Sequence, residues 1–212
     1  YFLAYKNRAT VQVALKNYAA ADNDYTKCIE LKPEDADGYL GRGSMKSIQN
    51  NYAEAISFYD KAIQYEPNNA VTFLNRGNAK YALKDTKGAL PDYIKVSQLQ
   101  PNNVNVYFNL GTIYMTQNKS NEAIEAFKKY NSGLPNEWSG YKNTADVYYT
   151  QLKQYDQAEI YYNKAYQINK SQKDIIERLG YSLLNQKKIP QAIAMFNNQI
   201  ALLPNDYWGY YN

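Results

Sequence analysis

Three asparagines stand at a regular spacing suited to recognition of a peptide backbone. Asn75, Asn109 and Asn143 follow one another at intervals of 34 residues. A side-chain amide donates hydrogen bonds through its NH2 group and accepts them through its oxygen. It can therefore grip both the C=O and the N–H of an extended peptide without reading the peptide's side chains. The three amides are therefore chemically suited to contact a protein or peptide ligand.

The neighbours of these asparagines offer rings, a further amide and a cation. Taken with the family resemblance given below, the predicted ligand contacts beside them are Leu74, Asn78, Tyr81, Phe108, Thr112, Lys142 and Tyr149. Aromatic rings are typical anchors of protein interfaces. The same rings could instead pack between repeats, and both interpretations remain open.

The residues that most enzymes and metal sites need are scarce or absent. The chain has no histidine and one cysteine, which excludes His-based catalysis, the commonest metal ligand and an intrachain disulfide. Cys28 falls at a small-residue position, so we interpret it as a core thiol. Residues 41–44, GRGS, resemble part of a phosphate loop but lie in a helical pattern with no preceding strand. We predict no catalytic residue, no metal and no cofactor.

A 34-residue period runs along the whole chain and must position these side chains. Pro33, Pro67, Pro101 and Pro135 are each 34 residues apart. Within residues 104–137, rings and small residues stand at fixed offsets, at Tyr107, Leu110, Gly111, Tyr114, Ala123 and Phe127. This is the pattern of a tetratricopeptide repeat (TPR). The chain resembles the TPR family over nearly all of its length.

The TPR resemblance implies an all-α fold, a right-handed superhelical solenoid of antiparallel helix pairs, with a helix A and a helix B in each repeat. We predict a single array over residues 1–212. The repeats cover approximately 2–35, 36–69, 70–103, 104–137, 138–172 and 173–206, with a partial seventh at 207–212. Places are numbered from 1 within each repeat. One repeat cannot bury its own apolar face, so each repeat packs on its neighbours.

Three places have residue types that suit close packing of helix A on helix B. Gly or Ala stands at place 8, Ala at place 20 and a large ring at place 24, which fills the groove that the small residues leave. Repeat five is one residue longer, and its Ala158 and Tyr162 fit only after a shift of one place. We interpret the extra residue as a superhelical kink or a partner site. Pro91, inside helix B of repeat three, is expected to shorten or bend that helix.

Arginine at place 7 and aspartate at place 23 recur together in two repeats. The pairs are Arg8 with Asp24 and Arg76 with Asp92. We interpret them as surface ion pairs between helix A and helix B, which contribute little to stability. Arg42 has Phe58 at place 23 and lacks that partner.

Charge and hydropathy argue against a nucleic-acid partner and against a membrane-spanning segment. The net charge is +4 and only repeat three is noticeably basic, whereas a nucleic-acid binder would carry a stronger basic stripe. No apolar run approaches the ~20 residues of a membrane span. We predict no nucleic-acid partner and no membrane span. Because the chain begins at Tyr1 and not at Met, we interpret it as an excised piece, so that targeting signals could have been lost. Its composition resembles that of bacterial proteins, and the bacterial cytoplasm and periplasm both remain open.

In the TPR family, helices A line a concave face that binds an extended peptide or a partner helix. The resemblance implies that places 2, 5, 6, 9, 12 and 13 face the ligand, and Asn75, Asn109 and Asn143 all stand at place 6. Asparagine is also a common consensus residue at that place, so binding and background both remain open. We predict a protein-interaction scaffold that uses the concave face of repeats two to five.

Two alternative functions remain open. The array could be the docking or regulatory arm of a larger enzyme, or of a secretion or assembly complex. It could also self-assemble by end-to-end stacking. The truncated C-terminal end carries Tyr207, Trp208, Tyr210 and Tyr211, and a solenoid end without a polar cap is prone to association.

Overall fold

The computed structural model describes residues 1–202, which form helices joined by short turns. These residues contain twelve α-helices, one π-helical segment and no β-strand. Within each of the two compact units described below, each helix packs mainly on its neighbours in sequence, as in a solenoid. The predicted all-α repeat fold is therefore confirmed. The C-terminal rings at 207–212, predicted to mediate stacking, lie outside the described residues.

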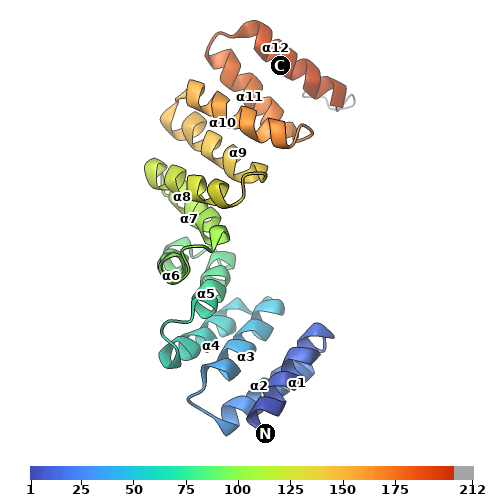
Figure 1. The fold of residues 1–212 in the computed structure, drawn as a ribbon, viewed down its shortest axis with the longest axis vertical. Helices are drawn as coiled ribbons and strands as arrows, with labels where there is room; N and C mark the ends of the chain where they lie inside the picture. The colour runs from blue at the N-terminus through green and yellow to red at the C-terminus, as the bar shows by residue number, and fades with distance from the viewer. Residues whose placement is uncertain (203–212) are drawn as a thin grey trace. The chain divides into compact units, whose positions relative to one another are not determined.

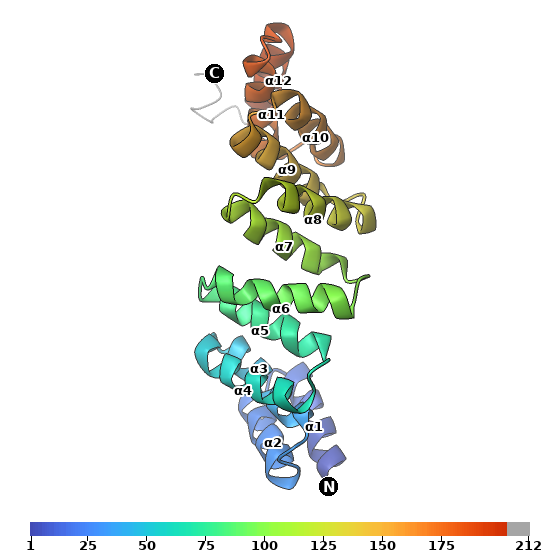
Figure 2. The ribbon, with the colours of Figure 1, turned by 90° about the vertical axis from the view of Figure 1, so that its left-hand side faces the viewer.

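The chain divides into two compact units, and unit 1 comprises residues 1–103. It is a stack of three helical hairpins (Figures 1 and 2). Its helices are α1 (Phe2–Ala14), α2 (Tyr18–Leu31), α3 (Ala36–Ile48), α4 (Tyr52–Tyr65), α5 (Ala70–Ala82) and α6 (Thr86–Leu99). The odd-numbered helices are the predicted A helices, and the even-numbered helices are the B helices.

Unit 2 begins at Val104, which is also a predicted repeat boundary. Its elements are α7 (Val104–Thr116), α8 (Ser120–Gly133), α9 (Trp138–Asp146), the π-helical η1 (Val147–Leu152), α10 (Tyr155–Ile168), α11 (Lys173–Asn185) and α12 (Ile189–Leu202). Each element again packs on its neighbours in sequence. That the two units belong to one array over residues 1–212 stays a prediction.

Glycine at place 8 lets the two helices of a repeat approach closely. A Cβ atom on Gly43 would lie 2.6 Å from the ring of Tyr59, and a Cβ atom on Gly111 would lie 2.6 Å from the ring of Phe127. Carbon atoms do not approach this closely without a shift of one partner. Both rings are fully buried. The prediction that place 8 makes room for the ring at place 24 is confirmed.

Each turn from helix A to helix B in residues 1–202 contains a left-handed residue that is not glycine. These residues, all Lys or Asn, are Lys16, Asn50, Lys84, Asn118, Lys153 and Lys187. At one such turn the N–H of Lys84 donates to the carbonyl of Tyr81 (2.9 Å), and the N–H of Asp85 donates to the carbonyl of Lys80 (3.0 Å). This pattern is a Schellman motif, which normally has glycine at its left-handed position. No glycine marks these turns in the sequence, so their left-handed residues could not be predicted from it.

The extra residue of repeat five lies in η1, at the end of its helix A. The left-handed residue that follows, Lys153, stands at place 16 and not at place 15. A π-helical segment accommodates one more residue than the α-helix it interrupts. The side chain of Gln151 in η1 donates to the carbonyl of Met115 (2.7 Å) and accepts from the hydroxyl of Ser120 (2.7 Å). The inserted segment thus bonds repeat five to repeat four, which neither interpretation from the sequence anticipated.

Pro91 does not shorten its helix, so that part of the prediction is wrong. Helix α6 has 14 residues, as α4 has. Pro91 cannot make the hydrogen bond from its own nitrogen to the carbonyl of Lys87, and its ring crowds that carbonyl. The side chain of Asp85 caps the start of α6 by accepting from the N–H of Gly88 (2.8 Å). The remaining bonds and this cap keep the helix at full length.

The two predicted ion pairs are present, but they are not surface pairs. Arg8 donates from Nε and Nη2 to Asp24 (2.8 and 2.6 Å). Arg76 donates from the same two atoms to Asp92 (3.0 and 2.5 Å), and Lys80 adds a third bond to Asp92 (2.9 Å). Both aspartates are buried, because place 23 points toward helix A, next to the ring at place 24. The surface interpretation is therefore wrong for the carboxylates.

Replacing Asp92 with asparagine should destabilise the fold strongly. The substitution keeps the size but leaves Arg76 and Lys80 without their buried counter-charge, which costs about 3 kcal/mol. Chemical denaturation measures the free energy of unfolding. Asp24→Asn is the matched control, since Asp24 pairs with the more exposed Arg8, and its loss should be smaller. Equal losses in the two variants would contradict the assignment.

Replacing Lys84 with glycine should stabilise the fold. Glycine removes the clash of a Cβ atom at positive φ, and after its greater chain entropy is subtracted the gain is about 0.5 kcal/mol. The same change at Lys61, which lies exposed inside α4, should cost about 1 kcal/mol. Thermal unfolding of the two variants therefore gives opposite shifts of Tm if Lys84 is left-handed in solution.

Candidate functional site

The A helices of unit 1 enclose an open groove of about 420 Å³. Its walls come from α1, α3 and α5, and the one lining residue from a B helix is Tyr25. Apart from Tyr25 and Met45, all the lining residues stand at the places that the TPR resemblance assigns to the ligand-facing surface. Apolar side chains such as Leu40 and Val71 line it together with polar ones such as Thr10 and Ser44. The groove has room for side chains of an extended peptide.

Tyr25 enters this groove at place 6 of repeat two, where the chain has a glycine and not an asparagine. Gly41 stands at place 6 of repeat two, and a Cβ atom on it would lie 2.4 Å from the ring of Tyr25. The ring therefore lies directly on the backbone of α3, in space that a side chain at place 6 would need. Sequence reasoning missed Tyr25 as a lining residue. A glycine at a place otherwise occupied by polar side chains was the available signal.

An ion pair joins two A helices at the same groove. Lys6 of α1 donates to Asp37 of α3, and both residues line the groove. The hydrogen bond to Asp37 raises the pKa of Lys6 against the opposing effect of its partial burial. The groove of unit 1 thus presents one cation and one anion that already pair with each other.

Asn75 is the one predicted site residue that lines this groove. Its side chain is half-buried, and within residues 1–202 it makes no side-chain hydrogen bond. Asn78 is one helical turn away, but its oxygen accepts from the hydroxyl of Tyr93 (2.8 Å), so part of that amide fastens α5 to α6. Leu74 is half-buried and Tyr81 is exposed. Both lie on α5 outside the groove walls.

In unit 2, two of the predicted site residues make contacts inside the repeat: Phe108 packs against other rings, and Thr112 bonds to its own helix. The ring of Phe108 lies 5.9 Å from that of Phe127 and 5.0 Å from that of Tyr130, which supports the packing interpretation for this ring. The hydroxyl of Thr112 donates to the carbonyl of Phe108 (2.9 Å). Asn109 and Asn143 are half-buried, and in the described part of the chain their side chains make no hydrogen bond. In the described residues these two amides, like that of Asn75, have no hydrogen-bond partner for their side chains.

Asp146 is the centre of a polar network between α9, α10 and α11. It accepts from Lys142 (3.0 Å) and from the hydroxyl of Tyr162 (2.5 Å), and Arg178 lies 4.0 Å away. Lys142 also pairs with Asp174 (3.1 Å). Burial lowers the pKa of Lys142, but the two carboxylates outweigh that effect and the pKa is raised. Lys142 therefore holds two repeats together as well as lying at a predicted ligand-facing place.

A second open pocket of about 420 Å³ lies on the A helices of repeats five and six. Tyr149 and Tyr181 contribute rings, and Asp174, Glu177 and Arg178 contribute charge. The guanidinium carbon of Arg178 lies 5.8 Å from the centre of the Tyr149 ring, a distance at which cation–π attraction acts. All five residues stand at predicted ligand-facing places. Sequence reasoning singled out Tyr149 but missed Asp174 and Glu177, because repeat six lacks an asparagine at place 6.

The described residues offer no grouped metal ligands. Within residues 1–202, no three His, Cys, Asp or Glu side chains come together as a metal site would require. Cys28 is buried and free, and burial raises the pKa of its thiol, which agrees with the core-thiol interpretation. None of the helices in this part of the chain combines the length and the apolar character of a membrane span.

Family models assign the chain to a known class of repeat protein. Models described as tetratricopeptide repeat match residues 6–70 and 145–172, and a model described as TPR repeat matches residues 77–118. Together these stretches cover more than half of the chain. The chain therefore belongs to the tetratricopeptide-repeat family.

Solved structures with the same fold are also TPR proteins. YrrB, described as a TPR protein with an unusual peptide-binding site, is 19% identical, with 88% of this chain and 96% of that chain covered and a TM-score of 0.79. A MamA structure is 20% identical over 80% of this chain and 92% of that one, with a TM-score of 0.76. MamA from Desulfovibrio magneticus RS-1, from residue 41 to its end, is 17% identical over 81% and 97%, with a TM-score of 0.73. A search of curated proteins found no match.

The buried hydroxyl of Tyr162 predicts a loss of stability in alkali. Burial, and then the charge of Asp146, raise the pKa of Tyr162. Because the folded pKa lies above the unfolded value of about 10, this contribution is complete below pH 10 and is lost as the pH rises further. The slope is about 1.4 kcal/mol per pH unit. Denaturation between pH 8 and 11.5 should show a smaller fall for Tyr162→Phe than for the native chain. Tyr1→Phe, at a fully exposed position, should leave the slope unchanged.

Proposed function

We propose that this chain is a non-catalytic scaffold that binds an extended peptide on the surface of its A helices. The observation that carries this proposal is that the groove of unit 1 and the pocket of unit 2 are lined from equivalent places of the repeat. The groove of unit 1 and the pocket of unit 2 are both lined mainly from the same ligand-facing places of their A helices. Two separate units with the same use of these places support a common binding role.

The uncommitted amides of Asn75, Asn109 and Asn143 are the proposed contacts to the peptide backbone. Each lies half-buried on an A helix, and in the described residues none of them bonds to another side chain, whereas nearby Asn78 and Lys142 do. A half-buried amide without a partner gains from each hydrogen bond that a ligand supplies. Leu74, Tyr81, Thr112 and Tyr149 are the proposed neighbours that contact peptide side chains. Asn78, Phe108 and Lys142 contribute mainly by holding this surface in place.

The family and its solved members favour the same function. TPR proteins are in general interaction scaffolds without catalytic activity, and YrrB is described as having a peptide-binding site. By analogy, we propose that the partner of this chain is a protein segment in extended form. A role as the docking arm of a larger assembly would use the same surface.

The test starts from peptides selected on the native chain from a random display library. The affinity of a selected peptide is then measured by fluorescence anisotropy for the triple variant Asn75→Ala, Asn109→Ala, Asn143→Ala. Each lost hydrogen bond is worth about 1 kcal/mol, so the affinity should fall about 100-fold. Helicity and Tm should stay as in the native chain, because these amides have no partner in the described fold.

The matched control replaces three asparagines on B helices. Asn23, Asn121 and Asn197 are exposed on α2, α8 and α12, and their replacement by alanine should leave the affinity unchanged. If both triple variants bind the peptide as well as the native chain does, the asparagine row has no binding role.

A further inference from the structure

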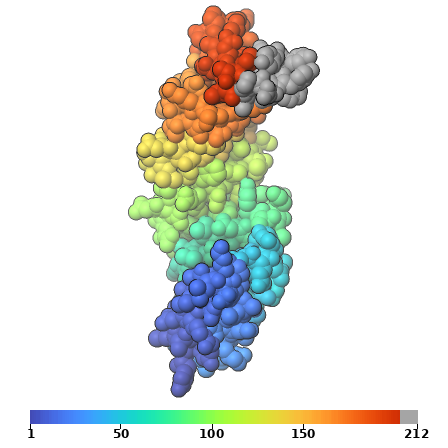
Figure 3. All heavy atoms as spheres, turned by 90° about the vertical axis from the view of Figure 1, so that its right-hand side faces the viewer, coloured from blue at the N-terminus to red at the C-terminus, as the bar shows by residue number. Residues whose placement is uncertain are grey.

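The pocket of repeats five and six contains a carboxylate without a partner. These repeats form the yellow to red part of unit 2 in Figure 3. Glu177 stands at place 5 of α11, is half-buried and lines the pocket. Within residues 1–202 it makes no ion pair and no side-chain hydrogen bond. A carboxylate that has lost part of its water is stabilised by a cation placed beside it, so Glu177 is suited to contact a positively charged group of a ligand.

The two cations nearest to the pocket are directed to other carboxylates. Lys142 pairs with Asp146 (3.0 Å) and with Asp174 (3.1 Å). Nε of Arg178 lies 4.0 Å from Asp146, and its guanidinium carbon lies over the neighbouring tyrosine ring. Among these side chains and Glu177, three carboxylates therefore share two cations. The network has one negative charge more than its own residues neutralise.

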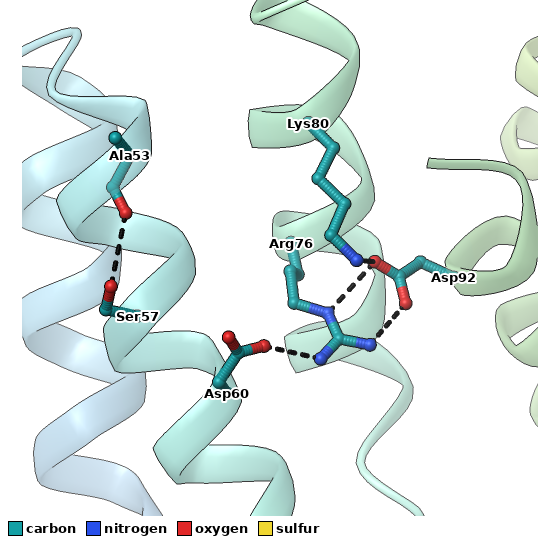
Figure 4. A network of polar contacts seen from close by, with 6 residues as sticks. All are labelled: Ala53, Ser57, Asp60, Arg76, Lys80 and Asp92. Carbon is teal, nitrogen blue, oxygen red and sulfur yellow. Dashed lines mark hydrogen bonds and ion pairs between the residues drawn. The ribbon is translucent and has the colours of Figure 1, made fainter. Parts of the chain in front are cut away.

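The network around Asp92 in unit 1 is balanced by comparison (Figure 4). Arg76 donates to Asp92 from Nε and Nη2 (3.0 and 2.5 Å) and to Asp60 from Nη1 (2.6 Å). Lys80 donates to Asp92 as well (2.9 Å). Two cations meet two carboxylates there. The unpaired carboxylate in unit 2 is thus not a general consequence of the repeat.

Two tyrosine rings line the same pocket. The ring of Tyr149 in η1 lies edge-on to the rings of Tyr155 (5.3 Å) and Tyr162 (6.4 Å). The ring of Tyr181 in α11 lies edge-on to that of Phe196 (5.5 Å). These contacts hold both rings in place. Arginine and lysine pack their apolar stems on such surfaces and keep the charged end beyond them, and the face of a ring also attracts a cation.

We propose that the pocket of repeats five and six binds an arginine or lysine side chain of an extended peptide. The stem of that side chain would lie on the rings of Tyr149 and Tyr181, and its charged end would bond to Glu177. This inference rests on the proposed function, because it names the chemistry of one side chain of that peptide. Residues 203–212 contain no lysine or arginine, so that segment does not supply the cation.

The probe for this pocket is N-acetyl-arginine N-methylamide, with its citrulline counterpart as a neutral control of nearly the same shape. A titration followed by NMR of the 15N-labelled chain should shift the amide signals of Tyr149, Glu177 and Tyr181. A single side chain should bind with a Kd of about 10 mM. The citrulline probe should bind about tenfold more weakly, because the charge-assisted hydrogen bond is lost.

Two variants of the chain locate the contact. Glu177→Gln keeps the size but removes the charge, and it should weaken binding of the arginine probe about tenfold. The matched control, Glu125→Gln, changes an exposed carboxylate of α8 and should leave the Kd unchanged. Circular dichroism should give the same helicity for both variants and the native chain.

The same pocket should select a basic residue in longer peptides. Among peptides selected from the random display library on the native chain, arginine or lysine should recur at one fixed position. Replacing that residue with alanine should lower the affinity of the native chain about tenfold. The same replacement should have little effect on the affinity of Glu177→Gln, since the two changes remove the same contact.

Three outcomes would overturn the inference. The first is that the arginine probe shifts none of these signals at tens of millimolar, and the second is that Glu177→Gln binds it as well as the native chain does. The third is tighter binding of N-acetyl-glutamate N-methylamide in the same pocket, because the guest would then be an anion on Arg178.

Failure of this inference can be told apart from failure of the proposed function. The triple variant at Asn75, Asn109 and Asn143 should bind the arginine probe as the native chain does, because the pocket contains none of these asparagines. Conversely, peptides that depend on the asparagines but carry no recurring basic residue would support the scaffold function and exclude the cation pocket.

Discussion

The packing of a large ring of helix B against a small residue of helix A, glycine or alanine, is the constraint on which the hairpins depend. Gly43 and Gly111 have no room for a Cβ atom because the rings of Tyr59 and Phe127 occupy that space. The two helices of a hairpin can therefore lie close together and bury the ring completely. Because helix B covers one side of each A helix, the opposite side stays accessible. The groove of unit 1 and the pocket of unit 2 lie on that side.

A buried and a half-buried carboxylate, Asp92 and Asp146, give a second level of organisation, between helices and between hairpins. Asp92 forms ion pairs with Arg76 and Lys80. Asp146 forms an ion pair with Lys142 and accepts a hydrogen bond from Tyr162. A carboxylate removed from water is tolerated only with such partners. Since the same arginine that satisfies Asp92 also reaches Asp60, the internal stability of one hairpin and its attachment to the next depend on shared side chains.

Much of the fold could be predicted from the sequence, because the period and the small residues at places 8 and 20 have direct packing consequences. The left-handed turns could not, since Lys84 and its equivalents carry no glycine signal and are held by the helices on either side. The side-chain contacts around the candidate site could be predicted only in part. The place of Asn75 follows from the register, but the bond from Tyr93 to Asn78 and the intrusion of Tyr25 under Gly41 depend on side-chain directions that spacing does not encode.

The π-helical segment at Val147–Leu152 shows how a repeat chain can accommodate one additional residue. One added residue in a globular core would displace every later contact, whereas here the register is restored within the same repeat, and Tyr162 is as fully buried as its counterparts. The cause is that each repeat packs only on its neighbours. Insertions of this kind can therefore accumulate one repeat at a time, and each gives the array a locally different surface on which selection can act.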